Sequence, residues 1–154
     1  MFIVRLVSAG IGLLLAVGAS QTSQEPRYTV LPWRSVKNIP GRLAGDQERH
    51  GSWEPTADEI SSLEMHLDKV SSLRARWWKP DIRIEHPERY FRQYIGVSQG
   101  RQRRIYINAF CDDPPPRDWH SRLYVVTDGA TCYWQALFDP ATKTFSDLTI
   151  NGRA

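Results

Sequence analysis

The clearest regular pattern of hydrophobic positions begins at Thr56. Four aliphatic residues then recur at three- and four-residue steps: Ile60, Leu63, Leu67 and Val70. This spacing is typical of one apolar face of a helix. Thr56 and Glu59 also match a capping box, in which two side chains bond the first free amides of a helix. We therefore predict an amphipathic helix from about residue 57 to residue 74.

After residue 90 the hydrophobic period changes from that of a helix to two, which is typical of β-strands. Five segments separated by turn residues are predicted as strands: residues 90–98, 103–110, 122–127, 132–139 and 144–151. Short links between strands favour antiparallel neighbours, so we predict a four- or five-stranded antiparallel meander with the helix on one face. The predicted fold class is α+β, comparable in architecture to cystatin-like or small periplasmic inhibitor folds.

Side chains alternate between the two faces of a strand, so residue parity assigns each side chain to a face. We expect the mainly aliphatic odd positions to lie under the helix. The even positions hold four of the six tyrosines and define a candidate binding surface on the opposite face: Tyr90, Arg92, Tyr94, Tyr106 and Tyr124. A role in binding requires Tyr94 and Tyr106 to be at least partly exposed. Burial of both would remove its main support.

The first third of the chain has no sustained period. Residues 1–20 combine one early cation, Arg5, with a short apolar stretch and small residues, which is typical of a secretory signal peptide. An uncleaved membrane anchor is the weaker alternative, because glycines interrupt the short apolar stretch. Residues 21–52 are predicted as an irregular arm, either lying along the domain or forming a mobile linker. Residues 53–154 then form the single α+β domain.

Charge and length limit the possible functions. Removal of residues 1–20 leaves 134 of the 154 residues and lowers the formal charge from +3 to +2, because Arg5 is lost. Such a chain suits one domain, and its near neutrality gives no electrostatic case for a nucleic-acid partner. The stretch from Arg74 to Arg104 has nine basic residues against three acidic ones, but the acidic helix offsets it. Within that stretch, Trp77 and Trp78 are expected to pack the helix end onto the sheet.

Cys111 and Cys132 are the only cysteines in the chain. In an exported protein two cysteines usually form a disulfide, and both fall on the same predicted face. However, the predicted meander places them near opposite ends of their strands, farther apart than the limit of about 7 Å between bridged Cα atoms. A bulge or a folded-back proline loop would permit the bridge. The alternative is two buried thiols.

The polar residues contain little recognisable chemistry. The four histidines show no metal-ligand spacing, so no metal or other cofactor is predicted: His50, His66, His86 and His120. The densest polar cluster follows Cys111, where Asp112, Asp118 and His120 are close enough in sequence for acid–base chemistry. We interpret this segment as a rigid, solvated loop, because nothing in it supplies a nucleophile, a phosphate loop or an oxyanion site.

Several separated motifs are familiar: Trp53-Glu54-Pro55-Thr56, Tyr90-Phe91-Arg92-Gln93-Tyr94, Ile105-Tyr106-Ile107-Asn108-Ala109-Phe110-Cys111, Asp128-Gly129 with Cys132-Tyr133, and Phe138-Asp139-Pro140-Ala141-Thr142 followed by Asn151-Gly152. Together they resemble a family of small exported bacterial proteins of unknown function, over about residues 53–154. The resemblance implies a bacterial source, a periplasmic or surface location if that source is Gram-negative, and stronger support for the disulfide. It implies no activity, cofactor or catalytic residue.

These observations favour a non-enzymatic protein, periplasmic or extracellular, that binds a protein or an envelope component through its tyrosine-rich face. No nucleic-acid partner, no catalytic residue and no membrane span after signal cleavage are predicted. One alternative is a small periplasmic hydrolase, which requires Asp112, Asp118 and His120 to converge in a pocket. A structural homodimer that uses the tyrosine-rich face as its interface is another alternative.

Overall fold

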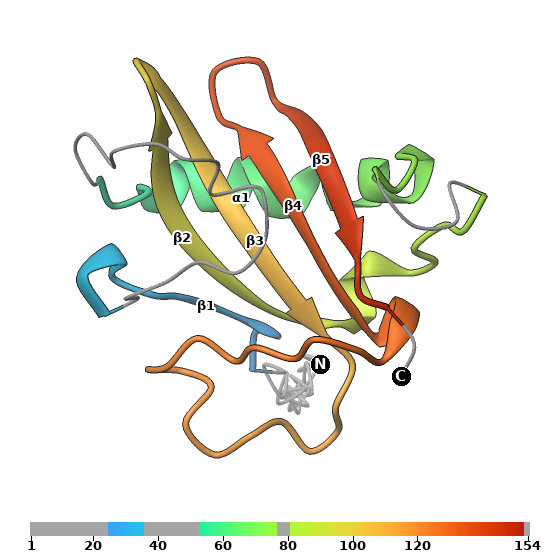
Figure 1. Cartoon of the computed structure of the whole chain (residues 1–154). Helices are drawn as coiled ribbons and strands as arrows, with labels where there is room; N and C mark the ends of the chain where they lie inside the picture. Colours follow the sequence, from blue (N-terminus) through green and yellow to red (C-terminus); the bar gives the residue numbers. More distant parts are fainter. Residues whose placement is uncertain (1–24, 36–52, 77–80, 153–154) are drawn as a thin grey trace, which may run out of the picture.

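The computed structural model describes residues 25–35, 53–76 and 81–152. The predicted signal peptide, most of the predicted arm, and His50, Trp77 and Trp78 lie outside these ranges. The described residues form one sheet with a helix, α1, packed across one face (Figure 1). The sheet contains five strands in spatial order: β1 (Tyr28–Val30), β2 (Phe91–Gln99), β3 (Gln102–Phe110), β4 (Tyr133–Asp139) and β5 (Thr144–Ile150).

Helix α1 (Ala57–Met65) begins as the sequence predicts but ends earlier. The hydroxyl of Thr56 accepts a hydrogen bond from the Glu59 backbone N–H at 3.3 Å, and the Glu59 carboxylate accepts from the Thr56 backbone N–H at 2.8 Å. The predicted capping box is therefore confirmed. After α1 the chain tightens into a 3-10 turn, η3 (Leu67–Ser72), and the apolar stripe continues through it. All four predicted stripe residues are buried against the sheet: Ile60, Leu63, Leu67 and Val70.

The prediction of a wholly antiparallel meander is wrong. Strands β2 to β5 follow one another in antiparallel order, but β1 pairs with β2 in parallel, with Tyr28 opposite Arg92. A parallel pair needs a long connection, and the chain between β1 and β2, which includes α1, provides it. The sheet is therefore mixed, and the comparison with cystatin-like or small periplasmic inhibitor folds loses its basis. Because β1 comes from the predicted arm, part of that arm belongs to the sheet.

Residues 122–127 do not form the predicted strand, and β4 pairs directly with β3. The backbone of this segment instead bonds to side chains that project from the sheet. The side chain of Gln93 donates to the Arg122 carbonyl at 2.7 Å and accepts from the Tyr124 N–H at 2.9 Å. Residues 122–127 therefore alternate between apolar and polar side chains like a strand, although they lie against the sheet and are not part of it.

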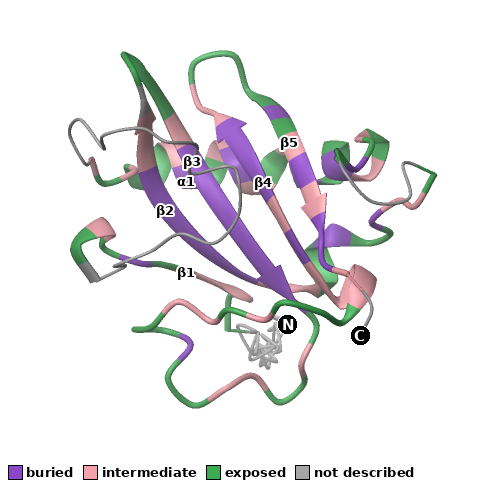
Figure 2. Ribbon diagram, viewed as in Figure 1, coloured by how far each residue is buried: buried purple, intermediate pink, exposed green. Residues whose placement is uncertain are grey.

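The predicted assignment of faces is correct for β3 and inverted for β2. The turn at Gly100 pairs Gln99 with Gln102, so odd residues of β2 lie beside even residues of β3. Tyr94 therefore joins the large core under α1 and η3. The opposite face holds a smaller buried cluster: Leu31, Ile95, Tyr106 and Leu137. Buried residues accordingly occupy much of β2, β3 and β4 (Figure 2).

Candidate functional site

The predicted tyrosine-rich surface does not exist as one face of the sheet. Tyr94 (0 % exposed) and Arg92 (3 %) lie on the helix side, whereas Tyr106 (1 %) lies on the other side with Leu31 of the arm. The split follows from the turn between β2 and β3, which reverses the parity of the two strands. Because Tyr94 and Tyr106 are both buried, this surface loses its main support as a binding site.

The two remaining tyrosines of the candidate surface are half-buried and lie apart from each other. The Tyr90 hydroxyl donates to the Thr131 carbonyl at 3.0 Å, and its ring packs edge-on against Trp134. Tyr124 lies in the segment after β3, where its ring contacts Phe110 at 5.0 Å between centroids. Of the predicted set, only Tyr124 belongs to the loop considered below.

A polar network centred on Arg92 joins α1 to β2. Its guanidinium makes a two-point ion pair with Glu64, with Nε 3.1 Å from Oε1 and Nη2 3.0 Å from Oε2. The Tyr94 hydroxyl donates to the same carboxylate and accepts from the Arg92 Nε at 2.9 Å. The remaining nitrogen, Nη1, donates to three backbone carbonyls around the 3-10 turn η4 (Pro87–Arg89): those of Pro87, Glu88 and Tyr90.

The charge states in this network follow from its burial. Desolvation by burial raises the pKa of Tyr94 well above its ordinary value, so its hydroxyl stays protonated and acts as a donor. Desolvation lowers the pKa of Arg92, but Tyr94 and Glu64 outweigh it, and the pKa is raised overall. Arg92 therefore remains charged and paired, which is the condition under which a buried guanidinium is tolerated.

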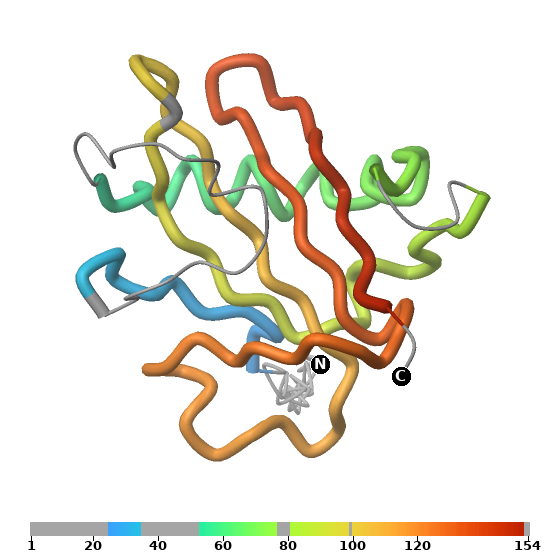
Figure 3. Tube along the Cα trace, viewed as in Figure 1, coloured from blue at the N-terminus to red at the C-terminus, as the bar shows by residue number. Residues whose placement is uncertain are grey.

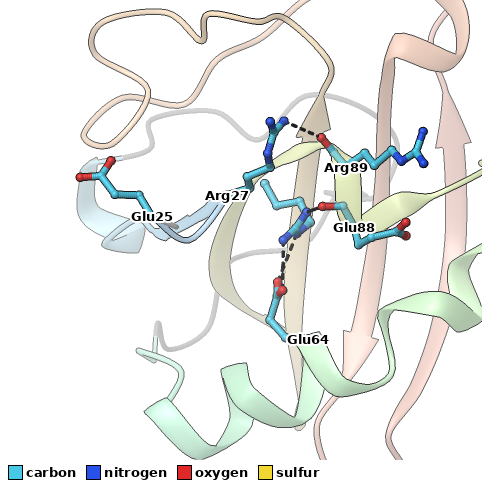
Figure 4. Close-up of a pocket in the computed structure, with 6 residues that line it drawn as sticks. Glu25, Arg27, Glu64, Glu88 and Arg89 are labelled. Carbon is cyan, nitrogen blue, oxygen red and sulfur yellow. Dashed lines mark hydrogen bonds and ion pairs between the residues drawn. The ribbon is translucent and has the colours of Figure 1, made fainter. Parts of the chain in front are cut away.

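An open pocket of about 600 Å³ lies over this network (Figure 4). It is lined by three glutamates and three arginines: Glu25, Arg27, Glu64, Glu88, Arg89 and Arg92. Arg27 donates to the Arg89 carbonyl at 2.9 Å and lies 3.6 Å from the Asp113 carboxylate. Because Arg92 and Glu64 already neutralise each other, the buried part of this pocket carries no unpaired charge for a ligand to meet.

The most distinctive feature of the fold is the segment from residue 111 to residue 129, which we call the 111–129 loop. It joins β3 to the 3-10 turn η5 (Ala130–Cys132) and contains no helix or strand (Figure 3). The Cys111–Cys132 disulfide closes its base, with the Cα atoms 5.0 Å apart, and confirms the predicted bridge. The predicted meander placed the two cysteines too far apart for a bridge. They lie side by side because Phe110 pairs directly with Tyr133, so that β3 ends where β4 begins.

Side-chain amides hold the loop against the sheet. Gln93 donates to the Trp119 carbonyl at 2.5 Å, in addition to its bonds with Arg122 and Tyr124. Asn108 donates to the Tyr124 carbonyl at 2.7 Å and to the Gln93 side-chain oxygen at 3.0 Å. The loop backbone is thus bonded to the sheet as another strand would be, but through side chains.

The amide series continues across the sheet. Asn151, just after β5, donates to the Val126 carbonyl at 2.5 Å, and Gln135 bridges Asn151 and Asn108 at 3.3 and 3.5 Å. Sequence reasoning missed these residues. The available signal was a single amide residue in each of four of the five predicted strands: Gln93, Asn108, Gln135 and Asn151. Such residues are costly in a core unless they are hydrogen-bonded, so they indicate a polar partner.

An aromatic cluster supplies a further anchor for the loop. The buried ring of Trp119 packs edge-on against Phe91, with 5.3 Å between centroids, and against Phe110 at 6.0 Å. Edge-on aromatic pairs in this range contribute beyond the area they bury. The loop is therefore held at its base by the disulfide, along its length by amides, and at its middle by Trp119.

The three residues of the predicted hydrolase loop do not converge. Both carboxylate oxygens of Asp112 accept from the Tyr133 hydroxyl, at 2.9 and 2.8 Å. Asp118 is exposed and pairs with Arg122 at 3.8 Å, while the exposed His120 ring packs against Trp119 in a tilted arrangement. None of the three lines the pocket over Arg92 or a second pocket beside the disulfide. Each side chain has a structural neighbour of its own, and they do not form a shared site.

No group of three histidine, cysteine, aspartate or glutamate residues within the described ranges is arranged to hold a metal ion. His66 Nδ1 lies 2.7 Å from the Ser62 carbonyl within the helix, and His86 Nδ1 lies 3.2 Å from Glu88. These two histidines therefore have local partners.

Comparison of the chain with protein-family models, with curated proteins and with solved structures finds no match in any of the three. The resemblance to small exported bacterial proteins therefore stays a prediction. Among the residues that the structure describes, no helix has both the length and the apolar character needed to cross a membrane. The disulfide is consistent with an exported protein, because such bonds persist in oxidising compartments.

Proposed function

We propose that this chain is an exported, non-enzymatic protein that binds a protein or another envelope component through the 111–129 loop. The observation that carries the proposal is the loop itself, which is long, lacks helix and strand, and yet is held in place by a disulfide and by buried amides. Loops of this length without regular structure are uncommon in compact domains and are usually functional when ordered. Binding residues also concentrate on loops that a rigid scaffold positions.

The outer surface of the loop supports a polar partner with some apolar contact. Its exposed side chains carry charges of both signs, including Arg117, Asp118 and Arg122. Val125 is 45 % exposed and adds an apolar group to the same segment. Because the backbone is already ordered, binding would cost little additional conformational entropy. Mixed charge around an apolar group is a better match for a protein surface than for a polyanion.

Site-specific photo-crosslinking in the native cells tests this proposal. A photoreactive residue at Val125 should form a discrete covalent adduct, because that side chain projects from the loop into solvent. The matched control places the same residue at Thr142, an exposed position in the turn between β4 and β5. An Arg122→Ala substitution, which removes an exposed loop charge, should reduce the adduct formed at Val125. Equal adducts at both positions, or none at Val125, would refute a binding role for the loop.

Export is tested separately from binding. The signal-like pattern of residues 1–20 and the disulfide both support it. Mass spectrometry of protein isolated from cells should find a chain that begins close to residue 20, with Cys111 and Cys132 bridged. A chain that retains Met1 and remains in the cytosolic fraction would contradict export.

A further inference from the structure

We infer that a second pocket, next to the disulfide, binds a small oxyanion, a carboxylate or phosphate group, through Arg89. The pocket has a volume of about 530 Å³, which lies within the range of small-molecule sites. Its lining comes from the chain before β2, from the first residue of the 111–129 loop and from η5: Arg83, Glu85, His86, Arg89, Tyr90, Cys111 and Thr131. This inference is independent of the function proposed for the loop.

Arg89 is the residue on which the inference mainly rests. Several arginines in the described chain pair with a carboxylate: Arg27, Arg76, Arg92, Arg104 and Arg122. Within the described residues, no carboxylate pairs with Arg89, which is exposed and is a lining residue of both pockets. A guanidinium presents parallel N–H groups that match the oxygens of a carboxylate or phosphate.

The turn that carries Arg89 is held in place before any ligand arrives. Arg92 Nη1 donates to the carbonyls of Glu88 at 3.0 Å and Tyr90 at 2.5 Å, on either side of Arg89. The Tyr90 hydroxyl donates to Thr131 at 3.0 Å and ties the turn to η5. None of these bonds uses the Arg89 guanidinium. The backbone that carries Arg89 is therefore fixed before binding, and its guanidinium is not used in these bonds, which lowers the entropic cost of binding.

Backbone strain borders the same pocket on two sides. His86 has φ 51° and ψ 57°, although it directly precedes Pro87, a position that favours extended backbone. Ala130, next to Thr131 of the lining, has φ 52°. Non-glycine residues in this left-handed region are strained, and such strain concentrates at ligand-binding sites. Four described non-glycine residues have such a positive φ, and two of them, His86 and Ala130, border this pocket, whereas Lys143 and Asp147 lie in the β4–β5 turn and in β5.

The charges of the lining favour an anion but moderate its affinity. The lining holds two arginines, Arg83 and Arg89, and a single carboxylate, that of Glu85. Glu88, which lies nearby, is engaged with His86 at 3.2 Å. Glu85 should repel a bound oxyanion, so its neutralisation should strengthen binding. This direction is opposite to the effect expected for the removal of Arg89.

The test is a titration of the intact protein followed by two-dimensional ¹⁵N–¹H NMR, with sodium phosphate and sodium citrate as separate probes. Sodium chloride at matched ionic strength controls for screening. Saturable shifts are expected at residues 83–90 and at Thr131, with a Kd on the order of 1 mM or tighter. Arg89→Gln should weaken binding by about tenfold, and Glu85→Gln should strengthen it by about threefold. Arg101→Gln removes the same charge from the turn between β2 and β3 and should change nothing.

Each outcome of the titration either supports the oxyanion site or overturns it. Saturation by phosphate alone or by citrate alone supports the site and identifies which oxyanion it accepts. Saturation by both supports a general oxyanion site. The inference is overturned if chloride produces the same shifts, if neither probe saturates, or if Arg101→Gln weakens binding as much as Arg89→Gln does. The last result would show that net charge, rather than this pocket, attracts the anion.

Discussion

One substitution, tyrosine to phenylalanine, should have different consequences at Tyr94 and Tyr106. Both side chains are fully buried in the same sheet, but on opposite faces. The Tyr94 hydroxyl bonds to Glu64 and Arg92, whereas the Tyr106 hydroxyl has no hydrogen-bond partner among the described residues. The pair therefore compares a satisfied buried hydroxyl with an unsatisfied one in a single protein.

The expected magnitudes follow from these partners. Tyr94→Phe removes hydrogen bonds to two charged groups and should lower the free energy of unfolding by about 1.5–3 kcal/mol. Tyr106→Phe removes a polar group that is buried without compensation, so the free energy of unfolding should stay unchanged or rise by up to about 1 kcal/mol. The two sites share no hydrogen-bond partner, so the double variant should show an additive change.

Urea unfolding followed by tryptophan fluorescence measures both effects. The midpoint of Tyr94→Phe should fall and that of Tyr106→Phe should hold or rise, while the m-value of each variant stays that of the parent. A change in the m-value would indicate altered compactness and would invalidate the comparison. If Tyr106→Phe destabilises the protein as much as Tyr94→Phe, the assignment of an unsatisfied hydroxyl to Tyr106 is wrong.

Three further predictions concern pH, the loop and the entry to α1. Burial raises the pKa of Tyr94 and Tyr106 above 10.0, so these two groups should leave stability unchanged just below pH 10 and lower it above pH 10, by about 1.4 kcal/mol per pH unit for each tyrosine. A flat profile to pH 11 in alkaline unfolding would contradict this. Gln93→Leu leaves loop backbone groups without partners, so hydrogen exchange in the loop should accelerate at least about tenfold while β4 exchange is unchanged. A Cβ at Gly96 would lie 2.1 Å from the Trp53 carbonyl oxygen, so Gly96→Ala should cost more than about 2 kcal/mol in urea unfolding. Gly152→Ala, with open space around it, is the control and should stay within about 0.5 kcal/mol.

The wrong face assignment of the tyrosines has one physical origin, the register between β2 and β3. Parity identified the alternation in β2, but the face on which each side chain lies depends on pairing with β3. One residue of difference in the turn moves every side chain of a strand to the other face. Tyr94 and Tyr106 consequently lie apart, although both have even numbers. A surface assembled from two strands could not be predicted without their register.

The 111–129 loop likewise depends on contacts between segments that are distant in the sequence. The sequence predicted the loop after Cys111 and favoured the disulfide, but the strand predicted over residues 122–127 placed the two cysteines far apart. The real partners of residues 122–127 are amides far away in the sequence, Gln93 and Asn108 among them. A loop bonded to side chains has no periodic signature of its own, so only tertiary contacts distinguish it from a strand.

By itself the sequence determined the start of α1, its apolar stripe and the approximate limits of β2 to β5. Those features depend on hydrogen bonds and periodicities within a few residues, which a local pattern records completely. The tertiary structure decided the parallel pairing of β1, the burial of the tyrosines, the bridge between Cys111 and Cys132 and the placement of Arg89 between two pockets. Each of these joins segments that are distant along the chain, and their energy depends on which surfaces meet after the strands have paired.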